Sequence, residues 1–330
     1  ALEGESFEGE WRAVEGSRYF QSPVLYKENG FKKKEDAQKL ICELSTQQPL
    51  ICTVEKIERK KENKNPPLLF NLAELQNVCS KLFKISPDET LSIVQDLYEK
   101  KLVTYPRTDA RVLSTAVAKE IYKNISGLRN YPQAGEAAQG ALELGAYKNI
   151  AKTRYTNDKQ ITDHYAIIPT GQGVGALKGL SLTAQRVYET IVRRFLSIFY
   201  PPAVYQKVSL VTKMENESFF SSFKVLLSEG YLKIAANSFA KKSMAEASGK
   251  TPESEGEGEV SCDEALLAAL QKLKKGDILN INGLGIKEGE TSPPKRYNSG
   301  SMILAMENAG QLIEDEDLRS QIKGSGIGTS

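Results

Sequence analysis

Apolar residues recur along this chain at two spacings, and these separate helices from strands. Between residues 34 and 44 the apolar side chains stand at 37, 40, 41 and 44, the spacing of one helix face. Pro49 follows and stops this helix. Residues 50–61 alternate in a way that is typical of a strand, and short alternating segments broken by Gly and Asn fill residues 1–30. The first part of the chain is therefore predicted to be rich in strands.

Helix start signals dominate the next part of the chain. Pro66-Pro67 marks a boundary, and Asn71 then stands where a helix needs its N-terminal cap. Ser86 is followed by Pro87 and Glu89, which is the pattern of a capping box with proline in the first turn. Ser114 supplies a third cap. The predicted helices cover residues 72–82, 87 to about 100, 114 to about 124, and 134–144.

A long helix and a second set of strands come next. Thr183 is the predicted cap of a helix through Ile198, which Pro201-Pro202 ends. Its apolar face consists of Ala184, Val187, Ile191, Phe195 and Ile198. The alternation between 204 and 234 predicts antiparallel strands, the last of them at 231–234. Beyond them the predicted elements are a helix over 263–273, a strand pair within 277–292, and a helix that opens at Ser299.

This order of elements predicts an α+β chain of several domains. Residues 1–65 and 182–250 form a β-rich domain, and residues 66–181 form a helical domain inserted into it. Residues 241–261 are mostly Ala, Ser, Gly, Pro and Glu, and 251–261 are assigned as a flexible linker. Residues 262–330 form a partial, mixed C-terminal region. The missing initiator Met and the glycine-rich end indicate a piece of a longer protein.

Composition narrows the classes of function. The 330 residues are 40% hydrophobic and carry 44 Lys and Arg against 42 Asp and Glu, so a uniformly basic DNA-coating protein is excluded. No run of 18 apolar residues occurs, and the first residues do not resemble a signal peptide, so no membrane partner is expected. The single histidine argues against a Cys/His zinc site. The four cysteines are interpreted as buried free thiols in a reducing cytosol rather than as a Cys42–Cys52 disulfide.

The segment Thr104-Tyr105-Pro106-Arg107-Thr108-Asp109 carries candidate chemistry. Pro106 forces Tyr105 into an extended conformation, and in an extended segment Arg107 points to the same side as Tyr105. A phenol and a guanidinium on one side suit a phosphodiester, because the phenol oxygen can attack phosphorus while the guanidinium neutralises charge. The phenol, with an ordinary pKa of about 10, needs a nearby cation, base or metal to act. The alternative is a simple turn in which Arg107 pairs with Asp109 on the surface.

Two further stretches carry candidate residues. Asp163-His164-Tyr165 holds the only histidine, which can hydrogen-bond a phosphate or move a proton but is more often structural. The sequence alone does not place it near Tyr105. Pro293-Pro294-Lys295-Arg296-Tyr297 sets two cations and an aromatic ring after a stiff turn, which suits either a single-strand nucleic-acid contact or a solvated loop.

Taken in order, these stretches resemble the type IA DNA topoisomerases, and the topoisomerase III subgroup in particular. Residues 97–109 resemble the family's active-site segment, and 164–170 resemble its histidine motif. Residues 66–76 resemble the segment that opens the family's helical domain. The ranges 293–310 and 326–329 resemble two later motifs. Each match is weak alone, but the ordered set is specific.

The resemblance implies an ATP-independent isomerase that cuts one DNA strand, passes another through the break and reseals it. Tyr105 would form a 5′-phosphotyrosyl link, Arg107 would stabilise the scissile phosphate, and His164 would contact that phosphate or a neighbour. The DNA-binding residues would be Thr108, Asp109, Arg111 and Arg296, of which Thr108 and Asp109 would also organise the loop. The β-rich domain would be the arch of the strand-passage gate, and 262–330 part of the base of the ring.

The resemblance also implies what these residues lack. A Toprim domain with a Mg²⁺ site comes first in the family, and no candidate for it exists here, so no metal site is expected and the fragment alone should not complete the cycle. The implied partners are single-stranded DNA and the protein's own Toprim domain, in a monomer of the bacterial cytoplasm that is associated with the nucleoid. After Pro-Pro-x-Arg-Tyr the family continues with Thr-Glu-Ala, whereas this chain has Asn298-Ser299-Gly300.

Two other functions stay open from the residues. A tyrosine recombinase also uses a tyrosine nucleophile, but it draws on several Arg and His residues, and one histidine disfavours it. A non-catalytic single-strand binding or scaffold fragment is the other alternative. Covalent attachment of Tyr105 to DNA would separate both from the topoisomerase.

Overall fold

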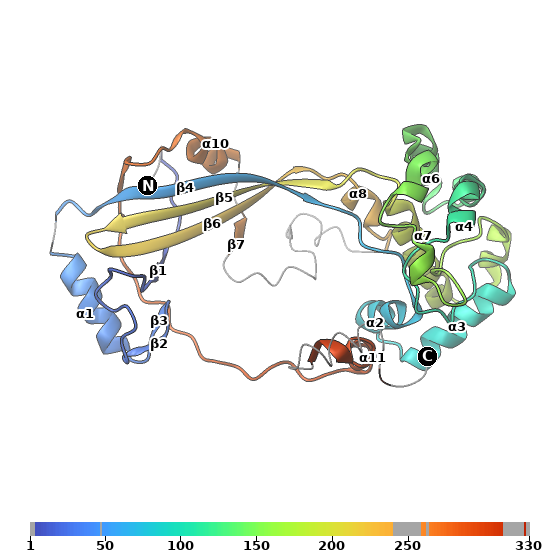
Figure 1. Ribbon diagram of the computed structural model, residues 1–330, viewed down its shortest axis with the longest axis horizontal. Helices are drawn as coiled ribbons and strands as arrows, with labels where there is room; N and C mark the ends of the chain where they lie inside the picture. Colours follow the sequence, from blue (N-terminus) through green and yellow to red (C-terminus); the bar gives the residue numbers. More distant parts are fainter. Residues whose placement is uncertain (1–3, 47, 240–258, 262–263, 313–326, 328–330) are drawn as a thin grey trace. The chain divides into compact units, whose positions relative to one another are not determined.

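The chain forms two compact units in a computed structural model that describes residues 4–46, 48–239, 259–261, 264–312 and 327 (Figure 1). The first, called here the sheet unit, contains residues 1–64, 204–228 and 242–293. The second, called the helical unit, contains 65–203, 229–241 and 294–330. Each unit has its own buried apolar cluster.

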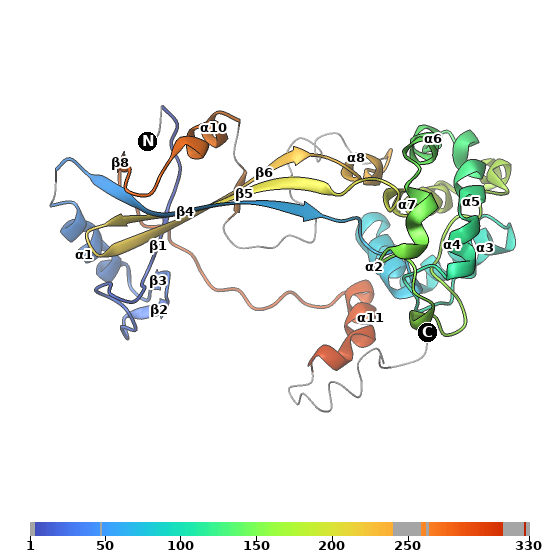
Figure 2. The same ribbon diagram turned by 45° about the horizontal axis from the view of Figure 1, so that its top comes forward.

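The sheet unit is built on three long antiparallel strands. β4 (Ile51–Lys64), β5 (Ala203–Met214) and β6 (Glu217–Ser228) lie side by side, and Figures 1 and 2 show them as long twisted ribbons. β5 alternates buried and half-buried positions along most of its length, as the sequence pattern predicts. The tight turn between β5 and β6 places Glu215 at a φ of 53°.

Short strands and two helices complete the sheet unit. The sheet order is β1-β6-β5-β4-β8, and β7 pairs in parallel with β6. The short strands are β1 (Glu10–Arg12), β2 (Leu25–Lys27), β3 (Gly30–Phe31), β7 (Glu259–Ser261) and β8 (Ile278–Asn280). Helices α1 (Lys34–Leu44) and α10 (Glu264–Lys272) bury leucines in the same cluster as Val54 and Phe223 of the sheet. Burial of these leucines is the hydrophobic contribution that holds both helices to the strands.

The helical unit begins with helices whose caps the sequence predicted. Asn71, Ser86 and Ser114 each accept a hydrogen bond from the backbone N–H three residues further on. Its helices are α2 (Leu72–Phe83), α3 (Pro87–Glu99), α4 (Thr115–Glu120), α5 (Tyr122–Gly127), α6 (Gly135–Leu144), α7 (Leu182–Ser197), α8 (Leu232–Ala235) and α11 (Ser299–Glu307). The 3-10 helices are Leu128–Asn130, Ala146–Lys152, Asp158–Gln160, Val174–Gly179 and Ala309–Leu312.

Helix α7 corrects the predicted boundary at residue 182. Its apolar face is buried as expected, but against the helical unit, which continues to Ala203. Val187, Ile191 and Phe195 are fully buried in the cluster that also holds Phe70 and Leu97. The face can be covered only where apolar side chains surround it, and those belong to the preceding helices. Its cap is Ser181, two residues before the predicted Thr183.

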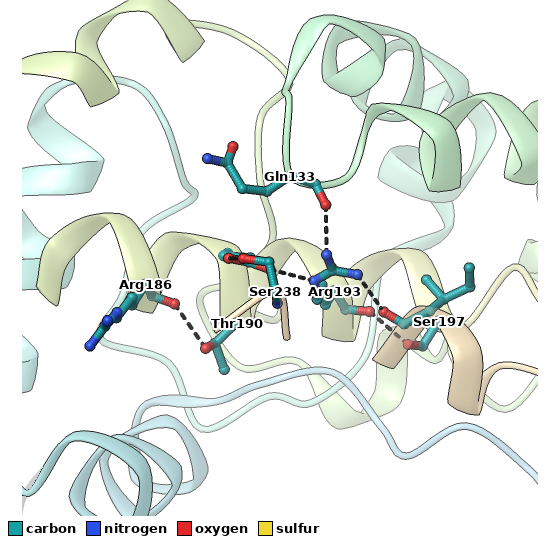
Figure 3. A network of polar contacts seen from close by, with 8 residues as sticks. Gln133, Arg186, Thr190, Arg193, Ser197 and Ser238 are labelled. Atoms are coloured by element: carbon teal, nitrogen blue, oxygen red, sulfur yellow. Dashed lines mark hydrogen bonds and ion pairs between the residues drawn. The ribbon is translucent and has the colours of Figure 1, made fainter. Parts of the chain in front are cut away.

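A buried carboxylate binds the returning chain to α7. Glu189, 3% exposed, pairs with Arg193 at 2.6 Å and accepts hydrogen bonds from the backbone N–H and the hydroxyl of Ser238, both at 2.7 Å. Arg193 also donates to the carbonyl oxygen of Ile234 and to that of Gln133, as Figure 3 shows. The segment after β6 is thereby bound to α7 by the ion pair and its hydrogen bonds.

Three further predictions are corrected. Residues 231–234 were predicted as a strand, but helix α8 occupies 232–235, because the backbone N–H of Tyr231 donates to Pro201 and the chain turns there. Of the predicted strand pair over 277–292, the structure has only β8, and residues 281–298 have no helix or strand. The region 262–330 is divided between the two units rather than forming one domain, since α10 packs in the sheet unit and α11 packs on α2.

The predicted linker over 251–261 is tested only at its end. Residues 251–258 lie outside the described part of the chain. Residues 259–261 form β7, so the prediction of a linker is wrong for them. Backbone pairing with β6 explains the difference, since a strand can be recruited through its N–H and C=O groups without an apolar pattern.

Candidate active site

Three segments that are far apart in the sequence are joined through their backbones around Tyr105. The N–H of Leu72 donates to Thr108 at 3.1 Å, and the N–H of Ile167 donates to Phe70 at 2.8 Å. Isolated bridges pair Phe70 with Ile167 and Val103 with Pro169. Residues 104–111, called here the Tyr105 loop, are therefore held between the chain that leads into α2 and the histidine motif.

This arrangement brings Tyr105 and His164 together, which the sequence could not predict. Their ring centroids lie 4.4 Å apart. The hydroxyl of Thr108 donates to the carbonyl oxygen of His164 at 2.7 Å, and that of Thr104 donates to Ala166 at 3.0 Å. Thr108 is 5% exposed, so its hydroxyl is committed to the fold rather than to solvent. The two threonines fix the spacing between the phenol and the imidazole.

Exposure alternates along the Tyr105 loop. Arg107 and Asp109 are exposed and Tyr105 is half-buried, whereas Pro106, Thr108 and Ala110 are buried. This pattern agrees with the expectation that Tyr105 and Arg107 lie on the same side. Within the described residues, Arg107 forms no ion pair with Asp109, so the surface pair of the simple-turn alternative is absent there. The guanidinium of Arg107 is exposed in the same loop as Tyr105, and it is therefore available to an anion.

Charged side chains connect the Tyr105 loop to α2 and α7. Arg111 donates from Nε to the carbonyl oxygen of Leu69 at 3.2 Å and lies 3.7 Å from a carboxylate oxygen of Glu74. Arg194 of α7 lies 3.8 Å from the same oxygen and stacks over the Phe70 ring at 4.1 Å. Arg111, expected among the DNA-binding residues, is thus engaged with its own protein in this structure.

Arg296 is not brought to this cluster by any contact that the structure describes. It lies in the exposed stretch before α11, together with Tyr297, which is 60% exposed. The unusual Asn298-Ser299-Gly300 has a clear structural use: Asn298 caps α11 in a capping box with Ser301. A Cβ on Gly300 would lie 2.9 Å from the Cα of Asn77, so glycine lets α11 approach α2 closely.

Several residues that contact the Tyr105 loop were not identified from the sequence. Tyr98 of α3 meets Tyr105 edge to face, with ring centroids 5.4 Å apart. Asn71 donates to the carbonyl oxygen of Asp109, and Glu74 pairs with Arg111. Of these two roles, the sequence indicated only that Asn71 caps a helix. Cys42, Cys52 and Cys79 are free thiols, as predicted, but only Cys52 and Cys79 are buried, whereas Cys42 is exposed. Burial raises the pKa of Cys79 to about 12.

The described residues offer neither a metal site nor a membrane-spanning helix. No group of three or more His, Cys, Asp or Glu in that part of the chain is arranged to hold a metal ion. The described residues therefore do not fit a Mg²⁺ site. Among the described helices, none combines the length and apolar character needed to cross a bilayer.

Comparison with known proteins places the chain in a family. The family model described as DNA topoisomerase matches residues 9–330. The chain is 34% identical over 267 residues to DNA topoisomerase 3 of Bacillus licheniformis, covering 80% of this chain and 33% of that protein. It is 30% identical over 321 residues to DNA topoisomerase 3 of Bacillus subtilis, covering 96% of this chain and 41% of that protein.

The solved structures add a similar fold. Full-length topoisomerase I from Thermotoga maritima matches with a TM-score of 0.55 and 22% identity, over 90% of this chain and 43% of that one. The chain thus spans about a third to two-fifths of the length of the relatives it matches.

Proposed function

Because the chain belongs to the type IA DNA topoisomerase family and is similar to topoisomerase 3 enzymes, we propose that Tyr105 cuts single-stranded DNA. The phenol oxygen attacks the phosphorus, a Tyr105–phosphate bond forms, and the bond from phosphorus to the 3′ oxygen breaks. The leaving 3′ oxygen takes a proton. The reverse reaction reseals the strand without ATP, since the phosphotyrosine keeps the energy of the broken bond.

The observation that carries this proposal is the 4.4 Å approach of the Tyr105 and His164 rings. A phosphate placed at the phenol would lie beside the exposed imidazole, and Arg107, exposed in the same loop, would supply the cation. Arg107 would neutralise the equatorial oxygens, and His164 would hydrogen-bond a phosphate oxygen or move a proton. Thr108 would contribute by holding His164, and Asp109, Arg111 and Arg296 would line the path of the strand.

Strand passage and metal chemistry would involve whole domains rather than single residues. We propose that the sheet unit is the arch of a gate and that the helical unit moves relative to it to admit a second strand. The acid and the Mg²⁺ chemistry would come from a Toprim domain outside these residues, so the 330 residues alone would not complete cleavage and resealing. The enzyme would act as a monomer in the bacterial cytoplasm, associated with the nucleoid.

Covalent trapping tests the nucleophile. The full-length protein that joins these residues to a Toprim domain is incubated with a 3′-end-labelled single strand and Mg²⁺ and then denatured. Wild type should retain label, and Tyr105→Phe should retain none because no phenol oxygen is available. Tyr98→Phe is the matched control, since it removes the hydroxyl of the adjacent ring and should leave trapping intact. Label on Tyr105→Phe would contradict the proposal.

Binding by the 330 residues separates a preformed groove from an incomplete one. Affinity for a short single strand and for a duplex of equal length is measured across a salt series. Preference for the single strand, weakened by Arg107→Ala and by salt, would support a groove already built here. A chain that binds but, joined to the Toprim domain, never forms the adduct would favour the non-catalytic single-strand binding alternative.

A further inference from the structure

One buried amide connects the Tyr105 loop to two helices. Asn71, 1% exposed, accepts a hydrogen bond from the N–H of Glu74 and so caps α2. Its Nδ2 donates to the carbonyl oxygen of Asp109 at 3.1 Å and also to a carboxylate oxygen of Glu307, the last residue of α11. The position of α11 is thereby linked to the backbone of the loop that carries Tyr105 and Arg107.

The surroundings of Glu307 disfavour the ionised form of its carboxyl group. Burial raises the pKa of its carboxyl, and the nearby charges of Asp109 and Glu74 act in the same direction, while the Asn71 bond and Arg111 oppose them. The charged groups facing it are Arg111 and Asp109 from the loop and Glu74 from α2, whose carboxylate also meets Arg194. A neutral side chain would be easier to bury here, so this carboxylate calls for an explanation other than packing.

Helix α11 packs closely on α2. α11 lies against α2 (Figure 1), and Gly300 at its first turn meets the backbone of Asn77 and the side chain of Ser80. A Cβ there would come within 3.0 Å of both. Gly300 at one end and Glu307 at the other therefore fix how far α11 approaches the helix that Asn71 caps.

We propose that Glu307 is a positioning residue for strand cleavage: with α11 seated on α2, its carboxylate holds Asn71 and, through Asn71, the Tyr105 loop in its reactive conformation. This inference rests on the proposed role of Tyr105. It makes cleavage dependent on the docking of α11, so that any movement lifting α11 from α2 loosens the loop and suppresses attack on DNA.

Two substitutions of Glu307 in the full-length protein test the inference. Glu307→Ala removes the acceptor, and the rate of covalent trapping should fall about tenfold, the loss expected for a hydrogen bond to a charged group. Affinity for single-stranded DNA should stay within about twofold, because Glu307 would not touch the strand. Glu307→Gln keeps an oxygen for Asn71 and should recover most of the rate. Met306→Ala, at an exposed neighbour on the same helix, is the control and should match wild type.

The pH profile separates positioning from packing. A neutral carboxyl is a weaker acceptor than a carboxylate. Trapping by wild type should therefore fall on acidification at a pH above the ordinary range of a glutamate, since the pKa of Glu307 is raised. Glu307→Gln is neutral throughout and should lack this step. An identical acid limb in both proteins would overturn the proposal.

Hydrogen exchange in the 330 residues gives a readout that needs no DNA. The N–H of Leu72 donates to the carbonyl oxygen of Thr108, and the N–H of Ala110 donates to the Thr108 hydroxyl. Both N–H groups should therefore exchange faster in Glu307→Ala and not in Met306→Ala. Gly300→Ala keeps the Glu307 side chain but forces α11 away from α2, and it should reproduce both losses. Unchanged exchange and unchanged trapping would reject the inference while Tyr105 still forms the adduct. An enzyme that never attaches to DNA would instead reject the proposed function.

Discussion

Two segments of this chain share three residue types and have opposite structural settings. Residues 104–109 and residues 293–297 both combine proline, tyrosine and arginine. In the first, alternate residues are buried, and the backbone bonds to Leu72 at the start of α2 and to Ile168 of the histidine motif. In the second, every residue is exposed and none lies in a helix or strand. Composition alone therefore did not decide which of the two could be an ordered reaction site.

The difference lies in what surrounds each backbone. The Tyr105 loop is enclosed by α2, α7 and the histidine motif, so its polar groups must be paired and each pair fixes a position. The stretch over 293–297 precedes α11 in solvent, where water can satisfy the same groups. Fixed side chains suit bond making, whereas exposed cations and rings suit a contact that follows a mobile strand.

The largest expected effect comes from breaking the buried ion pair of α7, the helix that braces the loop through Arg194. Glu189→Ala leaves Arg193 without its carboxylate and frees the N–H and hydroxyl of Ser238. We expect the free energy of unfolding to fall by about 3–5 kcal/mol, measured by urea denaturation followed through a helix signal. Glu120→Ala, which removes an exposed ion pair with Lys123, is the control and should leave the denaturation midpoint where it is. Equal midpoints for both variants would show that the pair does not brace the unit.

An intermediate effect is expected within the loop itself. Thr108→Val keeps the shape of the side chain but removes the bonds to the carbonyl of His164 and from the N–H of Ala110. Leaving buried polar groups unpaired should cost about 1–3 kcal/mol of stability. It should also lower trapping by more than it lowers DNA affinity, because the imidazole loses its position. Thr108→Ser should restore both, and failure of serine to do so would point to packing of the methyl group.

The smallest effect on stability is expected in the exposed stretch. Arg296→Ala should leave the urea midpoint unchanged, since nothing buried depends on it. If Arg296 contacts one phosphate, the slope of log affinity against log salt should become shallower by about 0.7 for a single strand. Filter binding between 50 and 200 mM salt measures the slope. An unchanged slope would remove Arg296 from the set of DNA-binding residues.

Local signals in the sequence were sufficient for most helices and for the long strands. Caps at Asn71, Ser86 and Ser114 depend on a side chain and the backbone three residues away, so they can be read directly. The boundary at 182 was wrong because the apolar face of α7 indicates that it is buried without indicating against what. Strand β7 was missed because its pairing with β6 leaves no pattern in three residues.

The ordered motifs determined the family from the sequence alone, since the residue types at Tyr105, Arg107 and His164 are chemical identities that need no coordinates. Only the tertiary structure decided that Tyr105 and His164 meet at 4.4 Å, that Thr108 faces inward, and that Glu307 reaches Asn71. These contacts join residues 56 to 236 positions apart. Long-range contacts of this kind arise from the packing of whole helices, and a single sequence carries no local record of which helices will pack together.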